Sequence, residues 1–460
     1  MAYILGFLAS LILVSASAIL LRWRVPVIFV FLWFFLSDSV RKLIPGQPPE
    51  ILLVGDALLL ITYLSFFAYY LIEKKERLWI PPFLGSLLAF ATVAIIQIFN
   101  PSLPSFQTAA IGLRSYLWFV PLVFLGYEFF WSKEQFLKFC RVLVYMAIPL
   151  FFFAVLQGVL GDTAPSFFRP FETTHQAHAF GIGFRGGPVD KISSIFGTDQ
   201  RYGAVSLFLF LTGLGLLAAS RTPKERSRSW VYAGTLSAFL GIIISGSGSA
   251  FVMAVFGFLL FVAIARRIAG KEKAIILWGF LKTKWVIFLF VLLLATLLGV
   301  YVFFSNVGLS QIFMFVRVFN HLPDVFIKDM QFVIPNAPIL GFGTGISAQG
   351  LQEIGQSKEG LAELAHQGGE TGVKRLLFEL GIVGFVVFYV FWGRIFFHIR
   401  RLLRTVTDSQ LKFVGVAIAL FAFLVLLRFT FVHHQALGDY AVLTPLWFFL
   451  GTLFKLKELR

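Results

Sequence analysis

Charged residues and cysteine are scarce in this sequence. Charged side chains make up 13% of the 460 residues, about half of their share in an ordinary soluble domain, so a soluble fold is excluded. The single cysteine, Cys140, excludes an intramolecular disulfide and leaves the redox compartment open. Internal repeats, heptads and low-complexity tracts are also missing. Hydrophobic side chains, in contrast, make up 58% of the chain, and this composition indicates an integral membrane protein.

The net charge is +16, which in a soluble protein would point to nucleic acid. Here the cations stand in short clusters between apolar runs, as expected for cytoplasmic loops, which retain Lys and Arg. We therefore expect no nucleic-acid partner. The first apolar run has no positive charge before it and no small-residue cleavage site after it, which predicts a retained helix instead of a signal peptide.

Apolar runs predict the membrane spans, because about twenty helical residues cross the hydrocarbon layer. Thirteen runs come near this length: 2–21, 25–40, 51–72, 79–98, 112–130, 136–160, 201–220, 229–246, 249–265, 284–304, 376–397, 411–431 and 438–454. The second run is short, and if it is re-entrant the number falls to twelve. The predicted fold is an all-α polytopic integral membrane protein with about 12–13 transmembrane helices.

The positions of Lys and Arg predict the orientation of these spans. Every basic cluster falls on one side of the thirteen-span arrangement, which predicts a cytoplasmic C-terminus. The outward loops are then 99–111, 161–200, 305–375 and 432–437. The predicted organisation is spans one to ten with the smaller outer loop 161–200 in residues 1–304, a large extracytoplasmic loop domain at 305–375, and the C-terminal spans at 376–460.

The interval from Ser305 to Arg375 is the only long polar stretch of the sequence. It holds Arg317, a Pro/Gly-rich turn at 335–345, and then His366 and Glu370. Because the bilayer core excludes charged groups, acid, base and cationic side chains can meet only in such a loop or in a cavity that it caps. Chemistry is therefore expected there.

Arginines are unusually frequent on the predicted outer face, where the positive-inside rule disfavours them. They are Arg114, Arg169, Arg185, Arg201, Arg317 and Arg375. Arginine binds phosphate through two parallel hydrogen bonds and does not deprotonate, so these residues suggest an anionic ligand such as a diphosphate headgroup. The alternative is that each arginine pairs with a nearby carboxylate.

Other ionisable residues have simpler interpretations. His366 and Glu370 are four residues apart but enclose two glycines and lack a third ligand, so we predict no metal site. Asp56 and Arg428 lie deep in apolar runs and are candidates for pairing across the bundle. Glu379 lies four residues after Arg375, which predicts a structural ion pair on one helix.

Five motifs, in this order, resemble the bacterial O-antigen ligase and polysaccharide polymerase family. They are Phe-Gly-x-x-x-Arg-Tyr-Gly at the start of a span (Phe196 to Gly203), a Ser-rich turn (Ser245 to Ala250), an outer loop with an early Arg317, a Pro-x-x-Gly-x-Gly turn (Pro338 to Gly343), and Glu370 placed nine residues before Glu-x-Gly (Glu379 to Gly381). The resemblance covers residues 190–400.

The resemblance implies inverting glycosyl transfer outside the membrane. A glycan on undecaprenyl diphosphate would pass to an acceptor hydroxyl without a metal, a nucleotide sugar or another cofactor. Arg317, Arg201, Arg114 and Arg185 would bind the diphosphate and stabilise it as it leaves.

Departures from the family pattern concern the base and the small turn. Family ligases carry a histidine followed by asparagine at the base position, where this chain has Glu370 and Thr371. Glu370 is the expected catalytic base, with His366 as the alternative. Gly248 stands where the small turn of the family carries an arginine. These departures favour an O-antigen or exopolysaccharide polymerase, or a ligase for another envelope glycan, over a lipopolysaccharide-core ligase.

The same resemblance implies a multi-pass protein of the bacterial inner (cytoplasmic) membrane with its active site on the extracytoplasmic side. Its place would be polysaccharide biosynthesis for the cell envelope. Its partners would be the undecaprenyl-diphosphate-linked glycan, a glycan or lipid acceptor, membrane lipid and a chain-length regulator.

Two other functions fit a protein with this many predicted spans. A lipid-linked oligosaccharide flippase or transporter would show inverted repeats, broken helices and ionisable groups near the midplane. A non-catalytic scaffold of an envelope assembly system would tolerate the combined loss of Arg317, Arg201 and Glu370.

Overall fold

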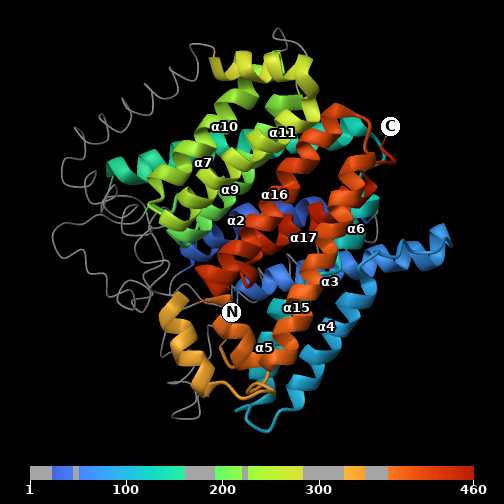
Figure 1. Cartoon of the computed structure of the whole chain (residues 1–460), viewed down its shortest axis with the longest axis vertical. Coiled ribbons are helices and arrows are strands. Elements are labelled where there is room, and N and C mark those ends of the chain that lie inside the picture. Colours follow the sequence, from blue (N-terminus) through green and yellow to red (C-terminus); the bar gives the residue numbers. More distant parts are fainter. Residues whose placement is uncertain are drawn as a thin grey trace.

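The computed structural model describes residues 23–44, 51–160, 192–219, 226–282, 326–347 and 371–459. These ranges are predominantly helical and contain no strand (Figure 1). The helices are α2 (Arg24–Leu43), α3 (Leu52–Ala68) with its π-helical extension Tyr69–Lys74, α4 (Leu84–Ile96) with the short turn Gln97–Phe99, α5 (Phe106–Leu117), α6 (Leu122–Phe129), α7 (Lys133–Leu160), α9 (Asp199–Ala219), α10 (Arg226–Ile244), α11 (Gly248–Lys282), α15 (Gly372–Thr405), α16 (Ser409–Phe431) and α17 (Tyr440–Lys455). An additional helix covers 326–336.

Each predicted span that falls in the described ranges overlaps helical residues, but the span 112–130 covers the end of α5, a turn and α6 instead of one continuous helix. Within these ranges, seven helices are long and apolar enough to cross a membrane: Leu53–Lys74, Phe106–Phe129, Lys133–Leu160, Asp199–Ala219, Gly248–Ile268, Gly372–Thr405 and Ser409–Phe431. Leu84–Phe99, Ser229–Ile244 and Tyr440–Lys455 are shorter apolar helices. The first and tenth predicted spans lie outside the described residues. The protein is therefore a polytopic, all-helical membrane protein.

The centre of the bundle is formed by α9, α16 and α17 (Figure 1). Nearly every residue of α9 is buried, and α16 and α17 are similarly enclosed. Their sequences are apolar on all sides, which is typical of a helix that is surrounded by other helices. In contrast, α3, α7 and α11 expose much of their apolar surface, as expected for helices that face lipid.

The α6 and α17 helices cross at glycines, where their backbones touch. A Cβ atom added to Gly126 would lie 1.8 Å from the carbonyl oxygen of Phe448, and one added to Gly451 would lie 1.9 Å from that of Val123. The Thr452 hydroxyl donates to the Gly126 carbonyl at 3.0 Å. Small residues allow this close approach, which gives van der Waals contact that lipid tails cannot replace.

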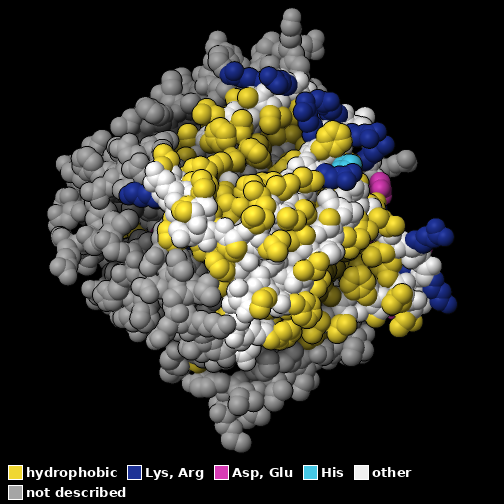
Figure 2. Space-filling view, turned by 60° about the horizontal axis from the view of Figure 1, so that its bottom comes forward, with side chains coloured by type: hydrophobic (Ala, Val, Ile, Leu, Met, Phe, Trp, Pro, Cys, Tyr) yellow, Lys and Arg dark blue, Asp and Glu magenta, His cyan; other side chains and the backbone are white. Residues whose placement is uncertain are grey.

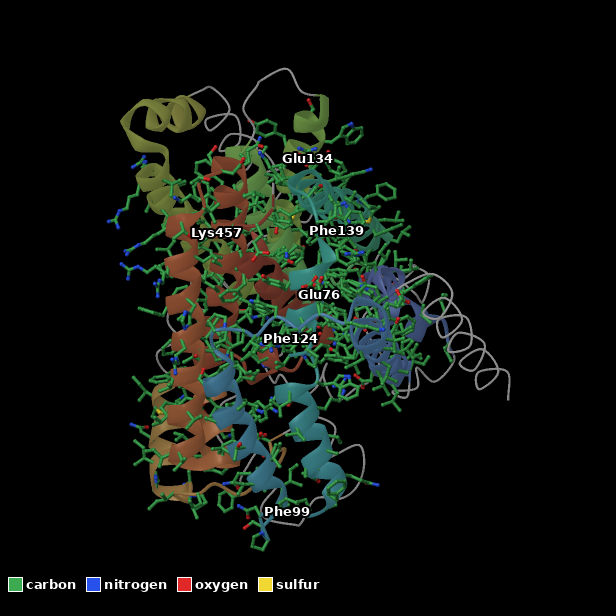
Figure 3. The ribbon with its side chains drawn as sticks, turned by 90° about the vertical axis from the view of Figure 1, so that its right-hand side faces the viewer. Glu76, Phe99, Phe124, Glu134, Phe139 and Lys457 are labelled. Carbon is green, nitrogen blue, oxygen red and sulfur yellow. The ribbon has the colours of Figure 1, made fainter. Side chains whose placement is uncertain are left out.

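The bundle has two chemically different ends. At one end, which we call the basic end, Lys133 donates to Asp408 at 2.6 Å and Lys74 to Glu128 at 3.2 Å. The other end, which we call the loop end, gathers the segments 97–106, 192–200, 338–347 and 432–439. Figure 3 places Phe99 at the loop end and Glu134 near the opposite end. This separation agrees with the predicted alternation of basic and outward loops.

Candidate functional site

Arg201 joins three helices at the loop end. It lies in the first turn of α9, where its Nη1 atom donates to Asp38 on α2 at 2.5 Å. Its Nε atom donates to Asp439, the N-cap of α17, at 2.9 Å. Asp38 also accepts the Gly197 N–H at 2.7 Å, and Lys42 donates to the Phe196 carbonyl. The motif that begins at Phe196 is thereby fixed against α2.

Arg114 on α5 pairs with Asp56 on α3. Its Nε and Nη2 atoms donate to the two carboxylate oxygens at 2.7 and 2.9 Å, a bidentate geometry that is among the stronger forms of ion pair. Tyr440, which directly follows Asp439, packs edge to face on Phe119, and the Arg114 guanidinium lies over the ring of Phe119. Arg114 and Arg201 thus both lie near the start of α17, and the prediction that Asp56 pairs with a group on another helix is confirmed.

Arg375 and Glu379 form the predicted ion pair on α15, with Nε and Oε1 3.1 Å apart and both side chains buried. Three further groups complete this cluster. The Tyr116 hydroxyl donates to Glu379 at 2.8 Å, the Ser347 N–H donates to it at 3.2 Å, and Arg375 Nη2 donates to the Ser115 hydroxyl at 2.6 Å. A buried ion pair needs such additional hydrogen bonds to offset its loss of hydration.

The helix α15 is broken beside this cluster, at Gly381, which has φ 66° and ψ −170°. The turn 338–347 fills the break. Phe342 and Gly343 donate their N–H groups to the carbonyls of Phe378 and Glu379 at 2.6 and 3.1 Å, and Ile382 donates to the Ile339 carbonyl at 3.0 Å. A broken helix in a membrane protein must find such partners for its freed backbone groups.

Other motifs of the resemblance also meet. A Cβ atom added to Gly203, the last residue of the Phe196 motif, would lie 2.9 Å from the Ser247 side chain and 3.0 Å from that of Ala250. The Ser-rich turn is therefore packed against the start of α9. In the same way, Pro-x-x-Gly-x-Gly docks on Glu-x-Gly at the break in α15. Within the described residues, the structure thus brings the Phe196 motif together with the Ser-rich turn, and the Pro-x-x-Gly-x-Gly turn together with the Glu-x-Gly part of the fifth motif.

Arg428 is a buried arginine that the sequence identified only as an intramembrane ionisable group. It lies near the end of α16, is 5% exposed, and its Nε atom has no hydrogen-bond partner. It interacts electrostatically with Asp439 and Asp199, and Asp439 forms its ion pair with Arg201. The signal that could have singled it out is an arginine that ends a long apolar run next to an outer loop.

Four of the predicted site residues, Glu370, His366, Arg317 and Arg185, lie outside the described residues. The chain that directly follows Glu370 is well fixed, because Thr371 caps α15 and donates its N–H to Asp329 on the 326–336 helix at 3.0 Å.

Sequence reasoning missed Asp38 and Asp439 as partners of Arg201, because they are far from it in the chain. Among the described residues, no group of three or more His, Cys, Asp or Glu side chains is placed to hold a metal ion. In comparisons with known proteins, neither a protein-family model nor a curated protein sequence matches this chain.

Proposed function

We propose that this protein is a membrane glycosyltransferase of the O-antigen polymerase or ligase type. It transfers a glycan from undecaprenyl diphosphate to an acceptor hydroxyl, with inversion and without a metal, on the extracytoplasmic side of the bacterial inner membrane. The observation that carries the proposal is the guanidinium of Arg428. It is buried, it interacts electrostatically with Asp439, which binds Arg201, and its Nε atom has no hydrogen-bond partner within the described residues.

The attraction of Asp439 and Asp199 offsets part of the cost of burying Arg428, but no hydrogen bond compensates its Nε atom for the lost hydration. An anion that binds beside Arg428 removes this cost. A lipid diphosphate has the required charge, and its oxygens match the fork of a guanidinium. The substrate headgroup would therefore be held where α9, α16 and α17 meet.

Arg201 and Arg114 are held in place by carboxylates and still retain donors. The hydrogen bonds of Arg201 use Nε and Nη1, and those of Arg114 use Nε and Nη2. Among the described residues no hydrogen bond uses Nη2 of Arg201 or Nη1 of Arg114, and these are the donors proposed to bind phosphate oxygens. Donors that are fixed before the reaction stabilise a leaving diphosphate without reorganisation. Arg317 and Arg185 are proposed as further ligands.

In the proposed reaction the acceptor oxygen attacks the anomeric carbon from the face opposite the diphosphate. The bond from that carbon to the diphosphate breaks, and the diphosphate leaves with the electron pair. Glu370, or alternatively His366, takes the proton of the acceptor hydroxyl, an effect worth about two to four orders of magnitude in rate. The arginines neutralise the diphosphate as it departs.

The test uses purified protein in detergent with radiolabelled undecaprenyl-diphosphate oligosaccharide and no added metal or nucleotide. Wild type is expected to form longer lipid-linked products, as a polymerase, or to transfer the glycan to a second acceptor, as a ligase. Arg428→Gln, Arg317→Ala and Glu370→Gln are each expected to lower the rate by at least about tenfold. Arg400→Gln, which removes an exposed cation of the basic end, serves as the matched control.

A lipid-linked oligosaccharide flippase is the alternative, and the break in α15 at Gly381 favours it because transporters use broken helices. Lipid binding without turnover would contradict the transferase. Movement of the lipid-linked glycan across a reconstituted bilayer would then establish the flippase. If no movement is detected, the non-catalytic scaffold is the interpretation that agrees with the results.

A further inference from the structure

Several large apolar side chains are exposed at the loop end, where the sequence predicts a water-facing loop. Phe99, Phe106, Ile334, Ile339 and Leu340 are each between 66% and 80% exposed. We call these five residues the apolar tip. They come from two segments that touch, because Gln97 donates to the Leu340 carbonyl and Asn100 donates to the Gly341 carbonyl at 3.0 Å. Figure 3 shows Phe99 at the extremity of the molecule.

The apolar tip continues the lipid-facing surface of α15. Ile339 is hydrogen-bonded to Ile382, and Ile382, Val383 and Val386 on the same helix are also exposed. These three residues belong to a helix that is long and apolar enough to span the membrane, so lipid is what covers them. The tip lies directly beside this surface and carries no charged side chain that would separate it from the lipid.

The depth of the tip follows from the length of α15. Between Gly381 and the pair Arg400 and Arg401, an α-helix rises about 28 Å. The exposed Arg394 lies nearer to Gly381, and its long side chain can extend to the cytoplasmic headgroups. The hydrocarbon layer is about 30 Å thick. With Arg400 at the cytoplasmic headgroups, Gly381 and the turn that fills its break lie at the outer boundary of the hydrocarbon layer. The apolar side chains of the tip then reach acyl chains, and not bulk water.

We propose that the apolar tip is inserted among the acyl chains of the outer leaflet and anchors the turn 338–347 there. Polar groups beside it suit a headgroup environment. Lys328 and Asn336 are exposed on the 326–336 helix, and a lysine at this depth extends its ammonium towards the headgroups. Figure 2 shows hydrophobic side chains across the described part of the face in view, while most Lys and Arg side chains lie along its upper and right-hand edges.

This insertion ties the lipid to the buried cluster of the candidate site. The turn that carries Ile339 and Leu340 also supplies the N–H groups that hold the Phe378 and Glu379 carbonyls. The acyl chains of the outer leaflet thus help to hold the turn 338–347 in the break of α15. The inference rests on the membrane-embedded fold and not on the proposed glycosyl transfer.

The experiment introduces one cysteine at a time into the full chain, attaches a nitroxide label to it, and reconstitutes the protein in phosphatidylethanolamine and phosphatidylglycerol vesicles. Leu340→Cys and Phe99→Cys report on the tip, Val386→Cys on a lipid-facing position and Glu76→Cys on a water-exposed one. Wild type, whose Cys140 is buried, is treated in the same way as a blank. Collision of each label with oxygen and with a water-soluble nickel chelate is measured.

The expected result is that labels at Leu340 and Phe99 collide with oxygen and not with the nickel chelate, as at Val386. Collision with the chelate as frequent as at Glu76 would overturn the proposal in favour of a water-facing loop. Low collision with both reagents would also overturn it, because the tip would then be covered by protein, such as a second copy of the chain. Circular dichroism of each labelled protein verifies that the helices are retained.

Discussion

The ion pairs of this protein differ in their exposure to water, and the exposure determines how much each pair contributes to the free energy of unfolding. Arg375 and Glu379 are almost completely enclosed, with side chains 4% and 0% exposed. Removing one member of a buried pair leaves the other without compensation for its lost hydration. Lys74 and Glu76 lie at the surface, where exposed pairs contribute little.

Glu379→Gln is therefore expected to lower the free energy of unfolding by about 3 kcal/mol. Glu76→Gln, the matched control in an exposed pair, should change it by less than about 1 kcal/mol. Denaturation by sodium dodecyl sulfate, followed by circular dichroism, measures both. Equal effects of the two substitutions would contradict the role given to burial.

Asp408 at the basic end predicts a dependence of stability on pH. Burial raises the pKa of Asp408, but hydrogen bonds from Lys133 and from the Leu411 N–H lower it by more, so that the net shift is downward. The unfolded value is about 3.9. A carboxyl group whose pKa is lower in the folded state stabilises the fold above the unfolded pKa, and this contribution is lost as the pH falls through the folded pKa.

Asp408→Asn keeps an N-cap oxygen for α16 and removes only the charge. At pH 7 the variant is expected to be less stable than wild type by up to about 1 kcal/mol. The difference should shrink as the pH is lowered past about 4. Unfolding curves in detergent at several pH values measure it, and a difference that stays constant with pH would exclude Asp408 as the source.

At the scale of elements, the turn 338–347 and the helix α15 form one unit. The break at Gly381 frees backbone groups that only this turn satisfies among the described residues. The backbone conformation at Gly381 suits glycine, and an added Cβ atom would lie 2.1 Å from the Ile339 carbonyl oxygen. A side chain at this position must displace the turn.

Gly381→Ala is expected to lower the free energy of unfolding by about 1–3 kcal/mol, because it combines backbone strain with a steric clash. Gly393→Ala on the same helix is the control, since nothing lies within 4 Å of its added Cβ atom. Alanine there should be neutral or stabilise the helix by up to about 1 kcal/mol. Thermal unfolding of both variants in one detergent gives the comparison. A stable Gly381→Ala variant would show that the turn is not required.

At the scale of the whole molecule, the two ends of the bundle predict the orientation in the membrane. The basic end carries Lys133, Arg400 and Lys457, and the loop end carries the segments that the positive-inside rule places outside. Figure 3 shows Phe99 and Glu134 far apart along the molecule. Each end is built from several segments that are distant in the sequence. A single orientation in the membrane therefore places the basic segments in the cytoplasm and the predicted outer loops outside.

Accessibility to a membrane-impermeant maleimide tests this orientation. Lys328→Cys on the 326–336 helix, where the side chain is exposed, is expected to react in intact cells after permeabilisation of the outer membrane. Lys457→Cys at the basic end should react only after the inner membrane is opened. The reverse pattern would place the candidate site in the cytoplasm and exclude the proposed function. The buried Cys140 makes wild type the control.

The sequence was informative where a property depends on neighbouring residues. The Arg375 and Glu379 pair was predictable because positions four apart share a helical face. The sequence predicted that Asp56 has a partner, because a carboxylate in an apolar run needs one. It did not identify Arg114 as that partner. Asp38 and Asp439 remained hidden because they meet Arg201 through tertiary contacts.

The sequence by itself determined that this chain is a polytopic helical membrane protein and where most of its described apolar helices lie, because burying a backbone in lipid requires long apolar helices. Only the tertiary structure decided which ionisable groups meet. It paired Arg114 and Arg201 with carboxylates, left Nε of Arg428 without a partner, and filled the break in α15 with a distant turn. The physical reason is that helix packing, which no local pattern specifies, brings distant side chains within hydrogen-bonding distance of one another.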